Sequence, residues 1–137
     1  MPPVSPTMRR AGGAEVTRRE EIPLLGYPGD CGPEVFDAAP ELFRARVLLI
    51  ECSFVAPDDR DRAREYAHIH LDDIVERASL FENEAIVLTH FSLRYRPEEI
   101  LEALEALPAE ILDRVIPFLP RPAAPEWPVL PPADPIR

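Results

Sequence analysis

Four side chains in this sequence are suited to proton transfer or metal binding: Asp30, Glu51, His68 and His90. Carboxylates and imidazoles are the usual general acids and bases of enzymes, and both bind divalent metals. Three of the four follow segments predicted to be strands, and the fourth precedes a predicted helix. We expect these segments to form one α/β layer, which would bring the four side chains to a common edge.

His90 and Glu51 each end an apolar run. Residues 86–88 (IVL) predict a buried strand that ends at His90, and residues 47–50 (VLLI) predict a second that ends at Glu51. The carboxyl end of a buried strand is where α/β folds tend to place their chemistry. Position alone leaves an alternative open for His90, a core histidine held by one backbone hydrogen bond.

Asp30 lies in a turn after a third predicted strand. Residues 21–27 form a short apolar run, and residues 28–33 (PGDCGP) have the composition of a turn. Gly29 and Gly32 would permit the close approach of a ligand or of another backbone segment. An aspartate in this place is equally consistent with a cap of the turn or of the next helix.

His68 and His70 precede a predicted helix over residues 70–81. Two histidines at this spacing can bind a metal from an extended segment. The positive end of a helix favours neutral imidazole, which suits proton transfer near pH 7. His70 is also consistent with a polar, solvent-exposed residue at the start of the helix.

The charge and cysteine content exclude several classes of protein. The chain has 25 acidic and 15 basic residues, a net charge of −10, so it lacks the cationic surface of a non-specific DNA-coating protein. Cys31 and Cys52 have no zinc-finger spacing and predict free thiols in a reducing compartment. We find neither a signal peptide nor an apolar run of roughly 20 residues, and we expect a cytoplasmic protein without a membrane anchor.

Proline content predicts the domain organisation. The chain has 18 prolines, and many lie near its two ends. We predict a compact α/β domain over residues 15–119, between an irregular Pro- and Gly-rich segment (1–14) and a Pro-rich tail (120–137).

Further helices are predicted from apolar periodicity and from prolines at helix starts. They are residues 35–43 with a break near Pro40, a charged helix beginning at Pro57, a helix beginning at Pro97, and a short helix after Pro108 that directs Ile111, Leu112 and Val115 inward.

Four segments together resemble a known family. They are residues 29–31 (GDC), 47–54 (VLLIECSF), 66–68 (YAH) and 88–95 (LTHFSLRY). Their order and spacing are similar to the C-terminal half of metallo-β-lactamase-fold hydrolases, and within them to the ribonuclease Z group. The last segment is specific, whereas Gly-Asp alone is not.

The resemblance implies a fold and a set of roles. The fold would be the C-terminal half of an αββα sandwich, a mixed sheet with covering helices. Asp30 would bridge two divalent metal ions, usually zinc, and His90 would be a terminal ligand of the second ion. His68 would assist proton transfer at the scissile phosphate, oriented by Glu51. The family often has Thr in place of His70. The reaction implied is phosphodiester hydrolysis, with RNA as a candidate substrate.

The resemblance also predicts an incomplete site. The family's other ligands come from a His-x-His-x-Asp-His motif and a further histidine, and the 28 residues before Gly29 contain no histidine. We therefore expect little hydrolysis by this chain alone. Three origins stay open: a truncated gene product, one half of a split protein that pairs with its missing half or with a second copy, or a degenerate relative. Two alternatives stay open: a non-catalytic remnant or interaction module that pairs with a partner, and a small α/β protein with purely structural His and Asp residues.

Overall fold

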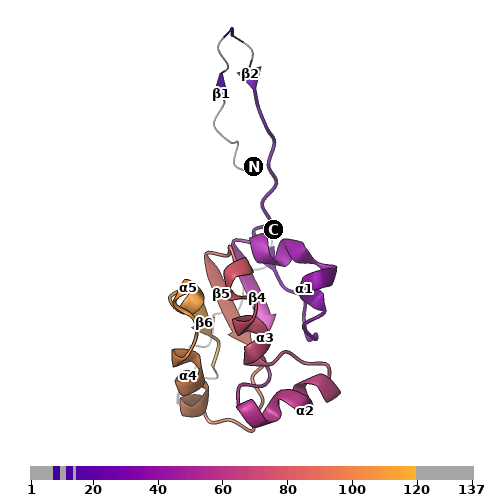
Figure 1. Cartoon of the computed structure of the whole chain (residues 1–137), viewed down its shortest axis with the longest axis vertical. Helices are drawn as coiled ribbons and strands as arrows, with labels where there is room; N and C mark the ends of the chain where they lie inside the picture. The colour runs from indigo at the N-terminus through magenta and orange to yellow at the C-terminus, as the bar shows by residue number, and fades with distance from the viewer. Residues whose placement is uncertain (1–7, 10–11, 14, 120–137) are drawn as a thin grey trace, which may run out of the picture.

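A four-stranded sheet forms the centre of the molecule, which the computed structural model describes for residues 8–9, 12–13 and 15–119 (Figure 1). The strand order is β3-β4-β5-β6, and the three pairings are parallel. The strands are β3 (Leu25–Gly26), β4 (Val47–Glu51), β5 (Ala85–Thr89) and β6 (Val115–Pro117). Glu51 pairs with Thr89, so the two central strands end level with each other.

The central strands form because their side chains alternate between two environments. Leu48 and Ile50 of β4, and Ile86 and Leu88 of β5, are fully buried on one face of the sheet. Each such side chain contributes about 1.5–3 kcal/mol through the apolar surface that it removes from water.

Short helices cover this buried face, and α3 lies in front of β4 and β5 in the view of Figure 1. Phe36, Ile74 and Leu104 bring three of the helices into the core. The helical segments are α1 (Val35–Ala38), η1 (Pro40–Arg44), η2 (Pro57–Asp59), α2 (Arg60–Glu65), α3 (Leu71–Val75), η3 (Ala78–Leu80), α4 (Pro97–Glu105) and α5 (Ala109–Leu112).

The opposite face of the sheet is apolar and open. Outward positions of β4 and β5 are half-buried. Four larger side chains at the two edges are mostly exposed: Leu25 (60%), Tyr27 (65%), Ile116 (51%) and Phe118 (71%). We call this surface the open face. It is unusual, because parallel sheets are normally covered on both faces.

The predicted α/β class is confirmed, but one detail of the sheet is wrong. We expected a mixed sheet, whereas every pairing within the four-stranded sheet of the described chain is parallel. Helical segments separate β3 from β4, β4 from β5 and β5 from β6, as parallel crossover connections require.

The helix predicted over residues 70–81 is also too long. α3 ends at Val75, and a separate 3-10 turn follows at η3. A continuing helix would direct the Arg77 N–H to the carbonyl of Asp73, but the Arg77 guanidinium takes that carbonyl at 2.8 Å. The backbone N–H bonds Ile74 instead, which tightens the chain into the 3-10 form.

The last predicted helix directs Ile111 inward as expected, and Val115 also packs against the core, but the inward position predicted for Leu112 is wrong. α5 is a single turn, Leu112 is 44% exposed and Val115 belongs to β6. This strand was not predicted because proline, here Pro117, is disfavoured in sheets. β6 is an edge strand, however, where a missing N–H donor is tolerated.

A two-residue antiparallel pair lies away from the main body in Figure 1. It joins β1 (Met8–Arg9) to β2 (Glu15–Val16), so the segment predicted to be irregular (1–14) contains one short strand. The predicted tail (120–137) lies outside the described residues, and the domain limits stay a prediction. None of the described helices has the length and apolar character needed to cross a membrane.

Candidate metal centre

Asp30 and His90 meet at the carboxyl edge of the sheet. Asp30 follows β3 through Gly29, whose φ of 77° is readily adopted only by glycine, and His90 directly follows β5. Oδ2 of Asp30 lies 3.4 Å from Nε2 of His90, and the two side chains are 61% and 48% exposed. Two of the predicted site residues are thus within reach of one ion and open to solvent.

The end of α2 places His68 beside this pair. The N–H of His68 donates to the Ala63 carbonyl (2.9 Å) and the N–H of Ala67 to the Arg64 carbonyl (3.2 Å), which is the Schellman arrangement. It requires a left-handed residue, and Ala67 supplies it with a φ of 55°. The imidazole rings of His68 and His90 then lie 5.4 Å apart between centroids.

Glu51 is the buried centre of the site, with a side chain 1% exposed. Its Oε1 contacts Nδ1 of His68 (2.5 Å) and accepts the backbone N–H of Cys31 (3.3 Å). Its Oε2 accepts the backbone N–H groups of Ser53 (3.0 Å) and Ile69 (3.2 Å). Three chain segments are therefore tied to one carboxylate, which also contacts the His68 ring.

Ser53 connects Glu51 to His90. Its Oγ lies 2.9 Å from Oε2 of Glu51 and 2.8 Å from Nδ1 of His90. Its carbonyl accepts the N–H of Ser92 (2.9 Å), which fixes the segment that follows His90. Sequence reasoning did not single out Ser53; the one available signal was a small polar residue just after a buried strand.

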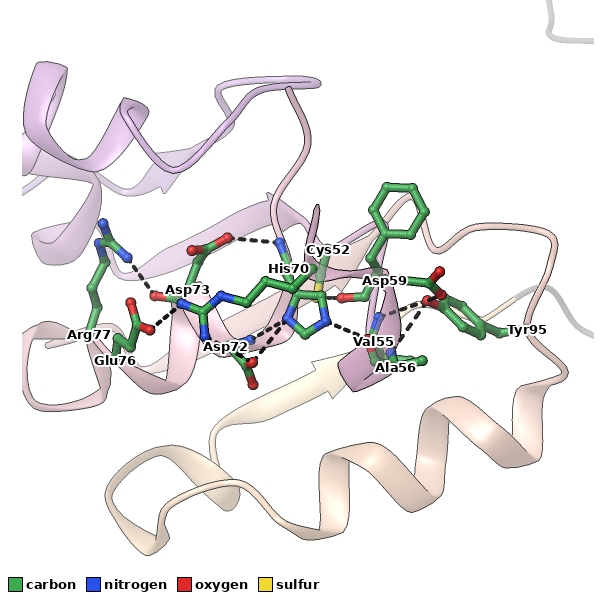
Figure 2. A network of polar contacts seen from close by, with 12 residues as sticks. Cys52, Val55, Ala56, Asp59, His70, Asp72, Asp73, Glu76, Arg77 and Tyr95 are labelled. Atoms are coloured by element: carbon green, nitrogen blue, oxygen red, sulfur yellow. Dashed lines mark hydrogen bonds and ion pairs between the residues drawn. The ribbon is translucent and has the colours of Figure 1, made fainter. Parts of the chain in front are cut away.

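His70 is a structural residue, and neither alternative left open for it, a metal ligand or a solvent-exposed residue, fits its surroundings. It is 1% exposed and caps α3, with Nδ1 accepting the N–H of Asp72 (3.0 Å). A nitrogen that accepts cannot carry the proton, so Nε2 carries it and donates to the carbonyl of Ala56 (2.7 Å). Figure 2 shows the ring between these two partners, an arrangement that leaves no free nitrogen for a metal.

Tyr95 holds the same loop from the other side (Figure 2). Its oxygen accepts the N–H groups of Val55 and Ala56, both at 3.3 Å, and its hydroxyl donates to Asp59. Partial burial, together with the Asp59 contact, raises the pKa of Tyr95 above its usual range. The loop after β4 is therefore fixed by His70 and Tyr95 together.

Cys31 lies next to Asp30 but does not resemble a reactive thiol. Burial, followed by the negative charge of Glu51, raises the pKa of Cys31 to about 11. In the metal-free chain the thiol therefore stays protonated at neutral pH.

The geometry of the edge fits a divalent cation. Oxygen and nitrogen ligands at roughly 2.0–2.2 Å from a tetrahedral ion lie about 3.4 Å apart, and Asp30 and His90 have this separation. Ligand atoms of Glu51, His68 and His90 also lie within 4.8 Å of one another. Of these, Glu51 already uses both oxygens to accept hydrogen bonds, whereas the facing atoms of Asp30 and His90 accept no other hydrogen bond that the described structure shows.

The site opens onto the open face of the sheet. A hollow beside Asp30 and His90 is also lined by Tyr27, Leu49 and Phe118. A ligand bound between Asp30 and His90 would therefore lie next to an uncharged, largely apolar surface.

Comparison with known proteins gives consistent relatives. The chain is 38% identical over 111 residues to tRNase Z TRZ1 of Arabidopsis thaliana, a match that covers 77% of this chain and 39% of the relative. It is 32% identical over 112 residues to the chloroplastic tRNase Z TRZ2 of the same plant, covering 80% of this chain and 32% of the relative. It is 35% identical over 78 residues to zinc phosphodiesterase ELAC protein 1 of Bos taurus, covering 57% and 22%.

Among solved structures, the short form of human tRNase Z (ELAC1) matches 48% of this chain and 26% of its own, with 33% identity and a TM-score of 0.41. No protein-family model matches. The matches span between about a fifth and two fifths of the curated relatives' lengths.

Proposed function

Part of this chain is ribonuclease Z-like and of the metallo-β-lactamase type, and from that premise we propose that it supplies one half of a metal-dependent phosphodiesterase site. The observation that carries the proposal is the 3.4 Å separation of Asp30 and His90, backed by the buried pair of Glu51 and His68.

We assign the four residues the following roles. Asp30 and His90 would hold the metal, Asp30 as a carboxylate shared by two ions and His90 as a terminal ligand of one of them. His68 moves a proton at the scissile phosphate through Nε2, because its Nδ1 is held by Glu51. Glu51 orients His68 and does not itself bind the metal. We propose zinc as the ion, which supplies Lewis-acid stabilisation of the charge that develops on phosphate oxygens.

We propose an RNA phosphodiester as the substrate class, since the relatives are named as tRNases Z and zinc phosphodiesterases. tRNA processing follows as the proposed process. We also propose a cytoplasmic location, because the two cysteines are free and a reducing compartment keeps them so.

Zinc binding to the purified chain tests the site. Isothermal titration should detect binding to the wild type and a loss of at least about tenfold in affinity for Asp30→Asn and for His90→Ala. Asp58→Asn is the matched control, because Asp58 is exposed and outside the site. Equal affinities for all four proteins would reject the metal site.

Hydrolysis of bis(p-nitrophenyl) phosphate tests the incompleteness of the site. Because Asp30 and His90 are fewer ligands than a catalytic zinc site uses, we expect little turnover by this chain alone. Rapid turnover that depends on Asp30 would contradict the half-site proposal and favour a complete enzyme.

A second proposal follows from the open face: the chain pairs with a partner that covers it, either as the other half of the site or as a non-catalytic interaction module. The outward positions of the four strands are uncharged apart from Glu51, whose side chain is buried; they are Leu25, Val47, Leu49, Ala85, Val87, Thr89 and Ile116, and Tyr27 and Phe118 lie just beyond the strand ends. Uncharged, contiguous surface of this kind is typical of interfaces. We propose that the partner contributes a second sheet, since sheets pack face to face over such side chains.

Light scattering after size exclusion tests the pairing. We expect a dimer or larger species for the wild type and a monomer for the double variant Tyr27→Lys, Phe118→Lys. A wild-type monomer at high concentration, with cooperative melting, would count against a second copy as the partner.

A further inference from the structure

We propose that Ser53 is a positioning residue that fixes the proton of His90 on Nδ1 and so turns the lone pair of Nε2 toward Asp30. The consequence for metal binding rests on the proposed function, whereas the position of the proton does not. Ser53 is 3% exposed, and its hydroxyl has two protein partners.

The hydroxyl of Ser53 has one hydrogen and two partners. The partner at 2.9 Å is Oε2 of Glu51, and a carboxylate oxygen can only accept. The hydroxyl hydrogen therefore goes to Glu51. The other partner is Nδ1 of His90 at 2.8 Å, which meets only a lone pair of Oγ and must bring its own hydrogen.

Backbone donors keep Glu51 in the role of acceptor. The N–H groups of Ser53 and Ile69 point at Oε2, and the N–H of Cys31 points at Oε1. A proton on Oε2, the oxygen that Ser53 contacts, would have to displace one of its two backbone donors. The direction of the Ser53 hydroxyl is therefore set by two backbone N–H groups, which can only donate.

Glu51 thereby sets the protons of two imidazoles. It does so directly for His68, whose Nδ1 lies 2.5 Å from Oε1, and through Ser53 for His90. Both rings carry their proton on Nδ1 and have Nε2 free. His70 is the opposite case, with its proton on Nε2, and it provides an internal reference within the same chain.

The lone pair on Nε2 of His90 faces Oδ2 of Asp30 at 3.4 Å. Two electron-rich atoms in this position repel each other unless a cation lies between them. Without Ser53, the ring could move its proton to Nε2 and donate it to Asp30, which would occupy the ligand atom. The serine hydroxyl thus keeps the pair available to a metal.

Backbone contacts make Ser53 well suited to this role. His90 adopts a φ of 60°, a conformation that a non-glycine residue keeps only when its surroundings hold it. The Ser53 carbonyl accepts the N–H of Ser92, and the neighbouring Cys52 N–H donates to the carbonyl of Thr89 (both 2.9 Å). Ser53 and Cys52 therefore form backbone hydrogen bonds to the chain on both sides of His90.

Long-range ¹H–¹⁵N NMR of the histidine-labelled, metal-free chain at pH 8 tests the proposal, because it reports which ring nitrogen carries hydrogen. In the wild type we expect Nδ1–H for His68 and His90 and Nε2–H for His70. In Ser53→Ala we expect the proton of His90 to move at least partly from Nδ1 to Nε2, while the proton positions of His68 and His70 stay unchanged. Ser53→Thr keeps the hydroxyl and should keep the wild-type pattern.

Two results would overturn the proposal: Nε2–H at His90 in the wild type, or an unchanged His90 pattern in folded Ser53→Ala. The wild-type spectrum decides the matter even if the alanine variant fails to fold.

Zinc titration of the same three proteins tests the consequence. We expect roughly 10–100-fold weaker binding by Ser53→Ala and near wild-type binding by Ser53→Thr, the usual effect of losing a group that orients a ligand. If the wild type binds no zinc but shows the expected proton pattern, the role of Ser53 stands and the proposed metal function fails. Unaltered zinc affinity in Ser53→Ala would reject the consequence of the proposal.

Discussion

Replacing Glu51 with glutamine removes the charge at the centre of the site while keeping the size of the side chain. The amide oxygen can stay in the place of Oε2 and continue to accept the N–H groups of Ser53 and Ile69. The amide NH₂ then occupies the place of Oε1. There it faces two donors, the N–H of Cys31 and Nδ1–H of His68, and it can satisfy neither.

The magnitude follows from these two contacts. An unsatisfied, partly buried N–H at Cys31 costs about 1–2 kcal/mol. The contact with His68 changes from charge-assisted to neutral, which costs about 1 kcal/mol more, and the ring must move its proton to Nε2 in order to accept. We therefore expect Glu51→Gln to lower the free energy of unfolding by about 2–3 kcal/mol, which corresponds to roughly 8–12 °C in melting temperature.

Urea unfolding and the histidine NMR experiment measure the two effects separately. Glu84→Gln is the matched control, because Glu84 is 65% exposed and its ion pair with Arg46 is worth at most about 1 kcal/mol. The reasoning is refuted if Glu51→Gln is no less stable than the control and His68 still carries its proton on Nδ1.

Three further predictions concern the surroundings of the site. Ala67→Gly should stabilise the chain by up to about 1 kcal/mol in urea unfolding, because it removes the left-handed strain at φ 55° and costs some chain entropy; a destabilised variant would contradict this. The raised pKa of Tyr95 means that the unfolded chain ionises first, so wild-type stability should fall as pH rises above roughly 10 and level off once the folded phenol ionises. Tyr95→Phe should lack this part of the alkaline decline in pH-dependent denaturation, and an equal decline would count against it. In the metal-free chain at pH 8, a thiol reagent such as DTNB should modify Cys31 slowly, because its raised pKa keeps the thiol protonated, and Cys52 only in denaturant, since burial raises the pKa of Cys52 and leaves it no exposed surface; labelling of Cys52 in the native chain would contradict that burial.

The sequence predicts the central strands and the edge where Asp30 and His90 meet for a simple physical reason. Apolar, β-branched runs at 47–50 and 86–88 have few alternatives to a buried strand, and neighbouring parallel strands end at the same edge. The residue that follows such a run is therefore located in space as soon as the run is assigned. Asp30 needed the further assumption that the run before it pairs with β4, which it does over two residues only.

The supporting groups were not predictable in the same way. Ser53 lies where a serine usually turns to solvent, and its role depends on contacts 2 and 37 positions away in the chain. The left-handed residue at the end of α2 is Ala67, so the sequence lacks the glycine that usually indicates such a turn. His70 resembled a surface residue because its partner, the Ala56 carbonyl, belongs to a loop that only the tertiary fold brings near.

The partners of Glu51 have a consequence for how the site comes into being. Cys31, His68 and Ile69 lie 20, 17 and 18 positions from it, so no short peptide of this chain contains even a rudimentary version of the site. Contacts between such distant positions require the chain to close the loops between them. Assembly of the edge and completion of the fold are therefore one event, and a bound ion would be released on heating in the same step that melts the sheet.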